Sequence, residues 1–243
     1  MRIRLVIQYN GRNYFGWQRL KERPETIQQT IEDVLSEALG HEVELCASGR
    51  TDAGVSAYRQ VAHFDTDTTL PIHKLPYILN FRLPPDISIL SAEKTSDAFH
   101  SRFDAKRKTY CYKIYTSPFG LPLSSDRLHI KHFLDIRSMR KACKYIEGSH
   151  DFTSFTKADS LKEDNVRCVY KCDVKECGGN IDIFVTGNGF LHNMVRIIAG
   201  TLVAVGEGKI KPKDIRDILR AKDRCRAFKT LPAHYLYLVD VRY

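Results

Sequence analysis

The sequence has no long apolar run and no closely paired cysteines. No stretch of its 243 residues approaches the ~18 consecutive apolar residues of a membrane-spanning helix. The apolar part of the start, Met1–Gln8, is also too short for a signal peptide. The seven cysteines are dispersed along the chain, and Cys168, Cys172 and Cys177 lack the CxxC spacing of a zinc site. These absences predict a cytoplasmic protein with reduced thiols, no membrane partner and no metal.

Acidic residues are in the minority. The chain has 38 Lys+Arg against 29 Asp+Glu, which gives a net charge of +9 and a pI near 9.2. Such an excess favours a polyanionic partner, because binding to phosphates releases counterions, and a nucleic acid is the first candidate. With 43% hydrophobic and 28% charged residues, the chain is expected to fold into a globular protein. Its length allows one large domain or two of about 120 residues.

Apolar periodicity predicts two similar series of elements. In the first half it predicts strands at 2–9, 43–47, 60–64 and 87–91 and helices at 26–39 and 71–81. In the second half it predicts strands at 109–115 and 235–241, a hairpin over 169–185, helices at 135–146 and 191–205, and a short helix near 213–220. Each half therefore follows the order β-α-β-β-α-β, with one extra helix in the second.

This repeated order predicts an α+β fold. Two ferredoxin-like (RRM-like) β-α-β-β-α-β halves, residues 1–104 and 105–243, would form a continuous antiparallel sheet with helices on one face. The other face would be free for a ligand.

The segment Ala47–Ala57, here called the Asp52 loop, is expected to carry the chemistry. Gly49 and Gly54 flank the Arg-Thr-Asp centre, so the backbone can take positive φ and approach a ligand closely. If this backbone is extended, Arg50 and Asp52 point to the same side, and the guanidinium keeps the carboxylate ionised. The same residue types also form ordinary surface turns, so the segment alone leaves both interpretations open.

A second candidate region is basic and aromatic. The run Lys106–Lys108 leads into a predicted strand on which Tyr110 and Tyr112 share a face. This pattern fits a nucleic-acid surface, and it equally fits a solvated strand end followed by core tyrosines. Further along the chain, Arg196 lies on the polar side of the predicted helix at 191–205.

Three segments together resemble the signature motifs of the tRNA pseudouridine synthase A family. They are Gly49–Val55 (GRTDAGV), Lys108–Tyr112 (KTYCY) and Gly187–Arg196 (GNGFLHNMVR). The resemblance extends nearly from end to end of the chain. Two positions depart from the family pattern: Ser56 replaces a usual histidine, and Tyr235 replaces a common glycine. The first concerns an RNA contact or the shape of the loop, and the second concerns the entry to the last strand.

The resemblance implies an isomerase that converts uridine to pseudouridine at positions 38, 39 and 40 of the tRNA anticodon stem-loop. It implies no cofactor and no metal, tRNA as a partner, and a homodimer. By the same match, Asp52 is the catalytic nucleophile, Tyr110 is the substrate-binding tyrosine of the active site, and Arg196 lies near the aspartate. Either Arg50 or Arg196 is then expected to pair with Asp52 and keep it anionic.

Several alternatives remain open at this point. The carboxylate of Asp52 could attack ribose C1′ or uracil C6, or it could remove a sugar proton. The basic aromatic regions could instead belong to a non-catalytic RNA-binding protein, although no segment fits the RNP pattern of a common RNA-recognition motif. A carboxylate glycosidase would need a second acid about 5 to 9 Å away, and the motifs supply arginine and tyrosine instead.

Overall fold

A computed structural model describes residues 1–161 and 163–243 of the chain. Contacts divide it into two compact units, Met1–Lys106 with Tyr237–Tyr243 and Arg107–Leu236. The sequence prediction assigned the last strand to the second half, whereas residues 237–243 belong to the first unit. The two units are taken in turn below, and the predicted domains 1–104 and 105–243 stay a prediction.

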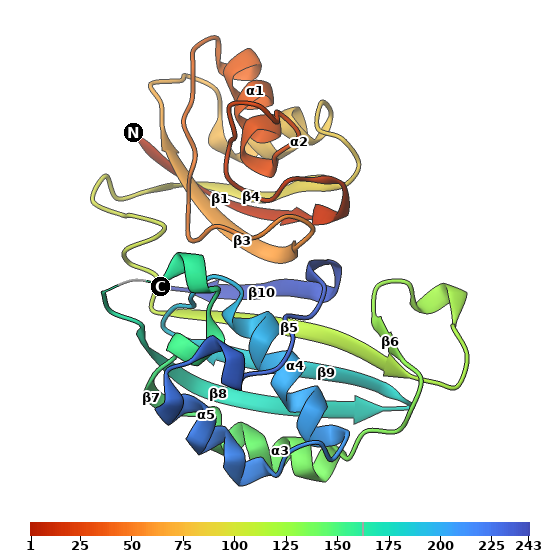
Figure 1. Ribbon diagram of the computed structural model, residues 1–243. Helices are drawn as coiled ribbons and strands as arrows, with labels where there is room; N and C mark the ends of the chain where they lie inside the picture. Colours follow the sequence, from red (N-terminus) through yellow and green to blue (C-terminus); the bar gives the residue numbers. More distant parts are fainter. Residues whose placement is uncertain (162) are drawn as a thin grey trace. The chain divides into compact units, whose positions relative to one another are not determined.

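The first unit is a sheet with two helices on one face (Figure 1). Its strands follow the order β4-β1-β3-β10, with β2 beside β3. The elements are β1 (Arg2–Tyr9), α1 (Ile27–Leu39), β2 (Cys46–Ala47), β3 (Ser56–Asp65), α2 (Leu75–Asn80), β4 (Ile87–Thr95) and β10 (Leu236–Arg242). β1 is antiparallel to both neighbours, whereas β10 runs parallel to β3 and pairs Tyr237 with Ser56.

The core of the first unit lies between the sheet and α1. Alternation along β1 and helical spacing along α1 turn one apolar row of each toward the other. These side chains have no exposed surface: Ile3, Leu5, Ile7, Ile27, Ile31 and Leu35. Each contributes about 1.5 to 3 kcal/mol when fully buried. Thr26 caps the helix by accepting a hydrogen bond from the Gln29 amide at 3.3 Å, and Gly40 ends it at a φ of 75°.

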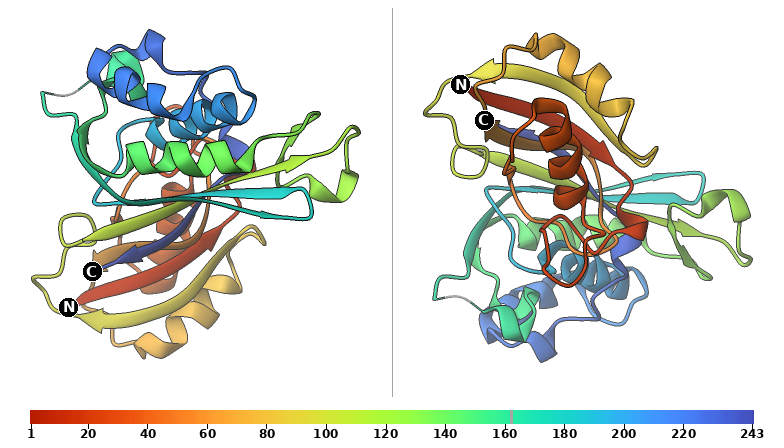
Figure 2. Two further views of the ribbon diagram at one scale, coloured as in Figure 1. Left: turned by 90° about the horizontal axis from the view of Figure 1, so that it is seen from below. Right: turned by 90° about the horizontal axis from the view of Figure 1, so that it is seen from above.

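The second unit is a sheet whose helices also lie on one face (Figure 2). Its strands follow the order β5-β9-β8-β7, with β6 beside β5. The elements are β5 (Arg107–Thr116), β6 (Leu128–Ile130), α3 (Ile136–Ile146), β7 (Gly148–Asp151), β8 (Val166–Cys177), β9 (Asn180–Gly187), α4 (Met194–Gly206) and α5 (Ile215–Ala221). α4 is buried along almost its whole length, but no helix in the described part of the chain is long and apolar enough to cross a membrane.

The α+β class predicted from the sequence is confirmed, with a correction to the sheet. The strands are mostly antiparallel, but β10 runs parallel to β3 and β6 runs parallel to β5, so the prediction of a purely antiparallel sheet is wrong. The short strands β6 and β7 were not predicted, because three or four residues are too few to show alternation. The ferredoxin-like character of the halves and their joining in one sheet stay predictions.

Two predicted helices begin later than their apolar patterns. The helix expected at 71–81 is a 3-10 turn at Ile72–Lys74 followed by α2, because Pro76 fits in the first helical turn, where its missing N–H has no partner to lose. The helix expected at 191–205 begins at Met194. Asn193 just before it is left-handed, with a φ of 63°, and such a residue cannot continue an α-helix.

All seven cysteines are free thiols, as predicted. Cys111, Cys143 and Cys172 are buried. Burial raises the pKa of Cys111 to about 12, so this side chain stays protonated and packs as a small apolar group.

Candidate active site

The Asp52 loop joins β2 to β3, so its aspartate lies between two strands as predicted. A turn closes at its centre, where the Val55 amide donates to the Asp52 carbonyl at 3.1 Å. Gly54 within this turn has a φ of 84°, which a side chain would strain. The Asp52 side chain is half-buried and that of Arg50 is exposed. The Asp52 side chain therefore extends from a hydrogen-bonded turn with a defined backbone conformation.

Thr51 fixes the loop from the residue next to the acid. Its hydroxyl is hydrogen-bonded to the Tyr9 hydroxyl at 2.8 Å, and its carbonyl accepts from the Trp17 amide at 3.1 Å. Tyr9 and Trp17 are themselves buried, at 3% and 2% exposure, and their rings are in contact. The aromatic residues after the first strand therefore support the loop. Their sequence pattern was equally consistent with base stacking or with a plug over the core.

Two glycines allow the preceding segment to approach the loop backbone. A Cβ on Gly16, whose φ is 93°, would lie 2.7 Å from the Thr51 carbonyl oxygen, and one on Gly11 would lie 1.9 Å from that of Val55. The Gly11 amide donates to the Ser56 hydroxyl at 3.0 Å. Ser56 is buried at 3% exposure, so its hydroxyl fixes the end of the loop from the interior of the unit.

Gln60 is a loop-supporting residue that the sequence analysis missed. It has no exposed surface, although its side chain is polar. Its amide oxygen accepts from the Ser48 hydroxyl at 2.6 Å, and its amide nitrogen donates to the Gly49 carbonyl at 2.9 Å. Its only sequence signal was a polar residue at an inward position of a predicted strand. Together with Tyr9, which bonds to Thr51, it holds the part of the loop that precedes Asp52.

The support from Tyr9 predicts a pH dependence of stability. Burial raises the pKa of Tyr9 to about 12, although bonds to Thr51 and Gln60 lower it. Between about pH 10 and this value the unfolded chain has lost the proton that the folded chain retains, so stability falls by about 1.4 kcal/mol per pH unit. Phenylalanine has no proton to lose, so the free energy of unfolding of Tyr9→Phe should fall less steeply with pH, by about 1.4 kcal/mol per pH unit. Urea unfolding of both proteins from pH 9 to 12 measures the two slopes. Parallel curves for the two proteins would contradict the assignment.

In the second unit, the two tyrosines of β5 have different environments. Tyr110 is half-buried and meets the edge of Phe190, with ring centroids 5.2 Å apart and an interplanar angle of 88°. Tyr112 has no exposed surface, and its hydroxyl donates to the Pro232 carbonyl at 2.8 Å. Burial raises the pKa of Tyr112 well above its usual value. Tyr112 is therefore a core residue, and Tyr110 is the one that retains accessible surface.

Arg196 lies in the first turn of α4, where hydrogen bonds orient its guanidinium. Nε donates to the Leu231 carbonyl at 2.7 Å, and a terminal nitrogen donates to the Asn193 side-chain oxygen at 2.6 Å. The left-handed backbone of Asn193 places that oxygen beside the helix start. The positive charge of Arg196 also lowers the pKa of Tyr112, against the larger effect of burial. Asn193 and Leu231 are thus positioning residues that the sequence analysis did not identify.

The predicted site residues are divided between the two units. Arg50 and Asp52 share one loop of the first unit, and Tyr110 and Arg196 belong to the second. The exposed Arg50 side chain makes no hydrogen bond or ion pair within residues 1–161 and 163–243. The structure therefore forms no Asp52–Arg50 pair, whereas the pairing of Asp52 with Arg196 stays a prediction, as does its meeting with Tyr110.

Among the described residues, one group has the atoms to hold a metal. Cys46, His63 and His100 each offer a ligand atom within 4.8 Å of the others. However, Nδ1 of His100 accepts from the Arg102 and Phe103 amides at 3.2 and 3.3 Å. In the neutral ring the proton is then on Nε2, 3.7 Å from the Cys46 sulfur. A metal needs a lone pair at that nitrogen, so this geometry favours an N–H···S hydrogen bond.

Comparison with known proteins gives a match to one family along most of the chain. Residues 5–104 and 142–243 match the family model described as tRNA pseudouridine synthase. The chain is 45% identical over 243 residues to tRNA pseudouridine synthase A 2 of Clostridium tetani, covering 99% of this chain and 98% of that protein. It is 46% identical over 242 residues to tRNA pseudouridine synthase A of Caldicellulosiruptor saccharolyticus, covering 99% of each. Asp52 and Arg196 lie inside the stretches that match the family model, and Tyr110 lies between them.

Proposed function

Because the chain belongs to the tRNA pseudouridine synthase A family, and is therefore an isomerase, we propose that it converts uridine to pseudouridine at positions 38, 39 and 40 of the tRNA anticodon stem-loop, with Asp52 as nucleophile. The observation that carries the proposal is the identity along the full chain, combined with an aspartate held at the centre of a braced loop. Membership in an enzyme family also argues against the non-catalytic RNA-binding interpretation.

The proposed reaction rearranges one nucleotide without adding or removing a group. The bond from ribose C1′ to uracil N1 breaks, the base turns, and a bond from C1′ to C5 forms. The hydrogen on C5 leaves as a proton, and N1 gains a proton. The ionised carboxylate of Asp52 attacks C1′ or C6, or removes a ribose proton, and the detached or turning base must stay bound throughout. All atoms and protons of this rearrangement are accounted for without a cofactor or a metal.

The other site residues support these steps. Tyr110 offers a flat ring for the uracil, and its hydroxyl is suited to assist proton transfer at C5. Arg196, oriented by Asn193 and Leu231, and the exposed Arg50 supply positive charge for the carboxylate. A base inside a stem must first be flipped out, at a cost of a few kcal/mol. Contacts between the basic residues at 106–108 and the phosphate backbone of the RNA offset part of this cost.

The test is to incubate the protein with unmodified tRNA that contains uridine at positions 38, 39 and 40, labelled with tritium at C5. Release of tritium reports the new bond at C5, and mapping of the product identifies the positions. A tRNA with cytidine at all three positions is the control. Modification confined to 38–40 is the expected result, and product at other uridines or no product would overturn the proposal.

Tyr110→Phe is expected to slow the reaction by about 10²-fold, because the ring remains for stacking while the hydroxyl that assists proton transfer is lost. Affinity for tRNA should change little. Single-turnover rates and filter binding measure the two quantities separately. Lower tRNA affinity with an unchanged rate would contradict the assigned role.

The homodimer is also a proposal. It follows the family resemblance and the large size of a tRNA relative to one chain of 27.9 kDa. Sedimentation equilibrium at assay concentration should give a mass of two chains, and a monomer there would remove the proposal.

A further inference from the structure

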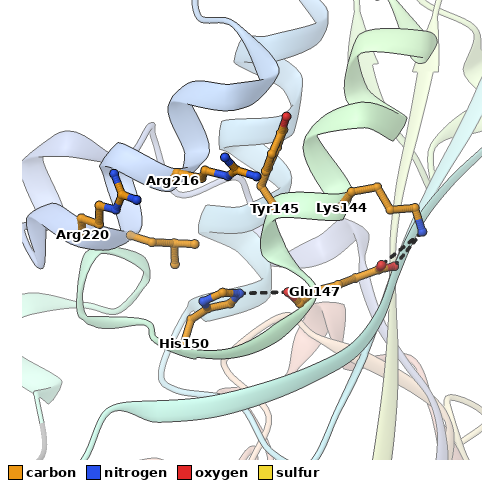
Figure 3. Close-up of a pocket in the computed structure, with 7 residues that line it drawn as sticks. Lys144, Tyr145, Glu147, His150, Arg216 and Arg220 are labelled. Carbon is orange, nitrogen blue, oxygen red and sulfur yellow. Dashed lines mark hydrogen bonds and ion pairs between the residues drawn. The ribbon is translucent and has the colours of Figure 1, made fainter.

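The helical face of the second unit carries a basic groove. Two adjoining hollows of about 330 and 640 Å3 share Lys144, Tyr145 and Arg216. We call them together the α3–α5 groove. Its other lining residues include Lys141, Glu147, His150, Lys211, Lys213 and Arg220. Figure 3 shows the smaller hollow, where Arg216 of α5 lies against Tyr145 of α3 and Lys144 points away from them toward Glu147.

The charge of the α3–α5 groove is almost entirely positive. Six of its lining residues are lysine or arginine, and Glu147 is the one acid among them. That acid is paired with Lys144 at 3.1 Å. Within the described residues, Lys141 and Lys213 have no carboxylate at ion-pair distance, and both are exposed. The groove therefore has positive charge that the protein itself does not neutralise.

One arginine of the groove is held in place by an aromatic ring. The guanidinium carbon of Arg216 lies 4.5 Å from the centre of the Tyr145 ring (Figure 3). This contact limits the conformations of a long side chain, so less entropy is lost when it binds a ligand. A guanidinium presents two parallel N–H groups that match the oxygens of a phosphate. The groove thus combines a positioned phosphate donor with lysines on either side.

The α3–α5 groove is separate from Tyr110, the proposed base-binding residue of the same unit. β7, which contributes His150, is separated from β5, which carries Tyr110, by β9 and β8. Three strand spacings correspond to about 14 Å. A phosphate bound in the groove therefore belongs to a part of the ligand distant from a base held at Tyr110.

We propose that the α3–α5 groove binds phosphates of the tRNA backbone away from the nucleotide that is modified. The inference rests on the proposed function, because tRNA is the ligand. A row of cations along a groove matches a polymer with regularly spaced phosphates better than it matches a single small anion. The groove adds affinity and orientation to the complex and takes no part in the chemical step.

The test compares two double variants with the same net charge. Lys141→Gln with Lys213→Gln removes two groove charges, and Lys131→Gln with Lys171→Gln removes two exposed charges elsewhere in the unit. The groove variant should bind tRNA about tenfold more weakly than wild type near 0.15 M salt, and the slope of log affinity against log salt should fall by about 2. Its KM should rise while kcat at saturating tRNA stays within about twofold. Lys141→Arg with Lys213→Arg should restore binding.

A second measurement uses the wild-type protein. Acetylation of amines with and without tRNA, read by mass spectrometry, should show Lys141 and Lys213 protected and Lys131 and Lys171 still reactive. Equal binding by the two double variants would overturn the inference. Full reactivity of the groove lysines in the complex would also overturn it and would point to a different acidic partner.

Binding and turnover separate the two proposals. If the wild-type protein binds tRNA with the expected difference between variants but forms no pseudouridine, the proposed function fails and the groove stands. If it forms pseudouridine and the groove variant binds like the control variant, the groove fails alone.

Discussion

Asp52→Asn is expected to lower the rate of pseudouridine formation by about 10⁴-fold or more, a loss typical of removing a reacting side chain. The amide has nearly the same size as the carboxylate, so the loop should keep its shape. That shape depends on neighbouring groups, such as the bond from the Trp17 amide to the Thr51 carbonyl at 3.1 Å. Affinity for tRNA should therefore change by less than about threefold. Tritium release and filter binding measure the two quantities.

Asp67→Asn is the matched control for this experiment. Its carboxylate is 98% exposed in the same unit, and the substitution changes the net charge by the same amount. It should leave both rate and affinity near the wild-type values. Equal product from Asp52→Asn and wild type would refute the catalytic role of Asp52, and a parallel loss of tRNA binding would reduce that role to substrate contact.

Gly200→Ala is expected to destabilise the protein by about 3 kcal/mol, although alanine in the middle of a helix normally adds about 1 kcal/mol. A Cβ at this position of α4 would lie 2.0 Å from the carbonyl oxygen of Lys229, so the neighbouring segment must move. The same segment carries Leu231, whose carbonyl accepts from Arg196. The rate should therefore also fall in the folded variant.

Gly120→Ala is the control, because a Cβ there has no atom within 4 Å in the described structure and the backbone is not left-handed. Urea unfolding of the two variants beside wild type gives the free energies. A Gly200→Ala variant as stable as wild type, or more stable, would show that the 229–231 segment can move at little cost in free energy and does not hold Arg196 in place.

The sequence predicted best those elements whose signals are local. For α1, the Thr26 cap, the apolar spacing and the final Gly40 all lie within one stretch of chain, and the structure confirms each. The hairpin of β8 and β9 was predicted from Gly178 and Gly179, and in the structure both have positive φ, as a tight turn between strands requires. Local conformational preference and alternation are properties of short segments, so a single sequence contains them.

Features that depend on distant partners could not be predicted in this way. The role of Gln60 follows from the register that places it beside Ser48 and Gly49, and no local pattern encodes that register. The cluster of Cys46, His63 and His100 joins positions far apart in the chain for the same reason. Asp52, Tyr110 and Arg196 were chosen from motifs that resemble a family. Their environments are now described, and their joint action stays a prediction.

The parallel pairing of β10 with β3 has a consequence for how the chain matures on the ribosome. Tyr237 and Leu238 pair with Ser56 and Ala57, the last two residues of the Asp52 loop, which lie about 180 residues earlier in the chain. Residues 1–106 alone therefore lack one strand of their sheet, and the first unit is complete only after residues 237–243 have been synthesised. A chain truncated before residue 236 would lack the strand that pairs with the end of the Asp52 loop, so we expect such a chain to hold that loop less firmly.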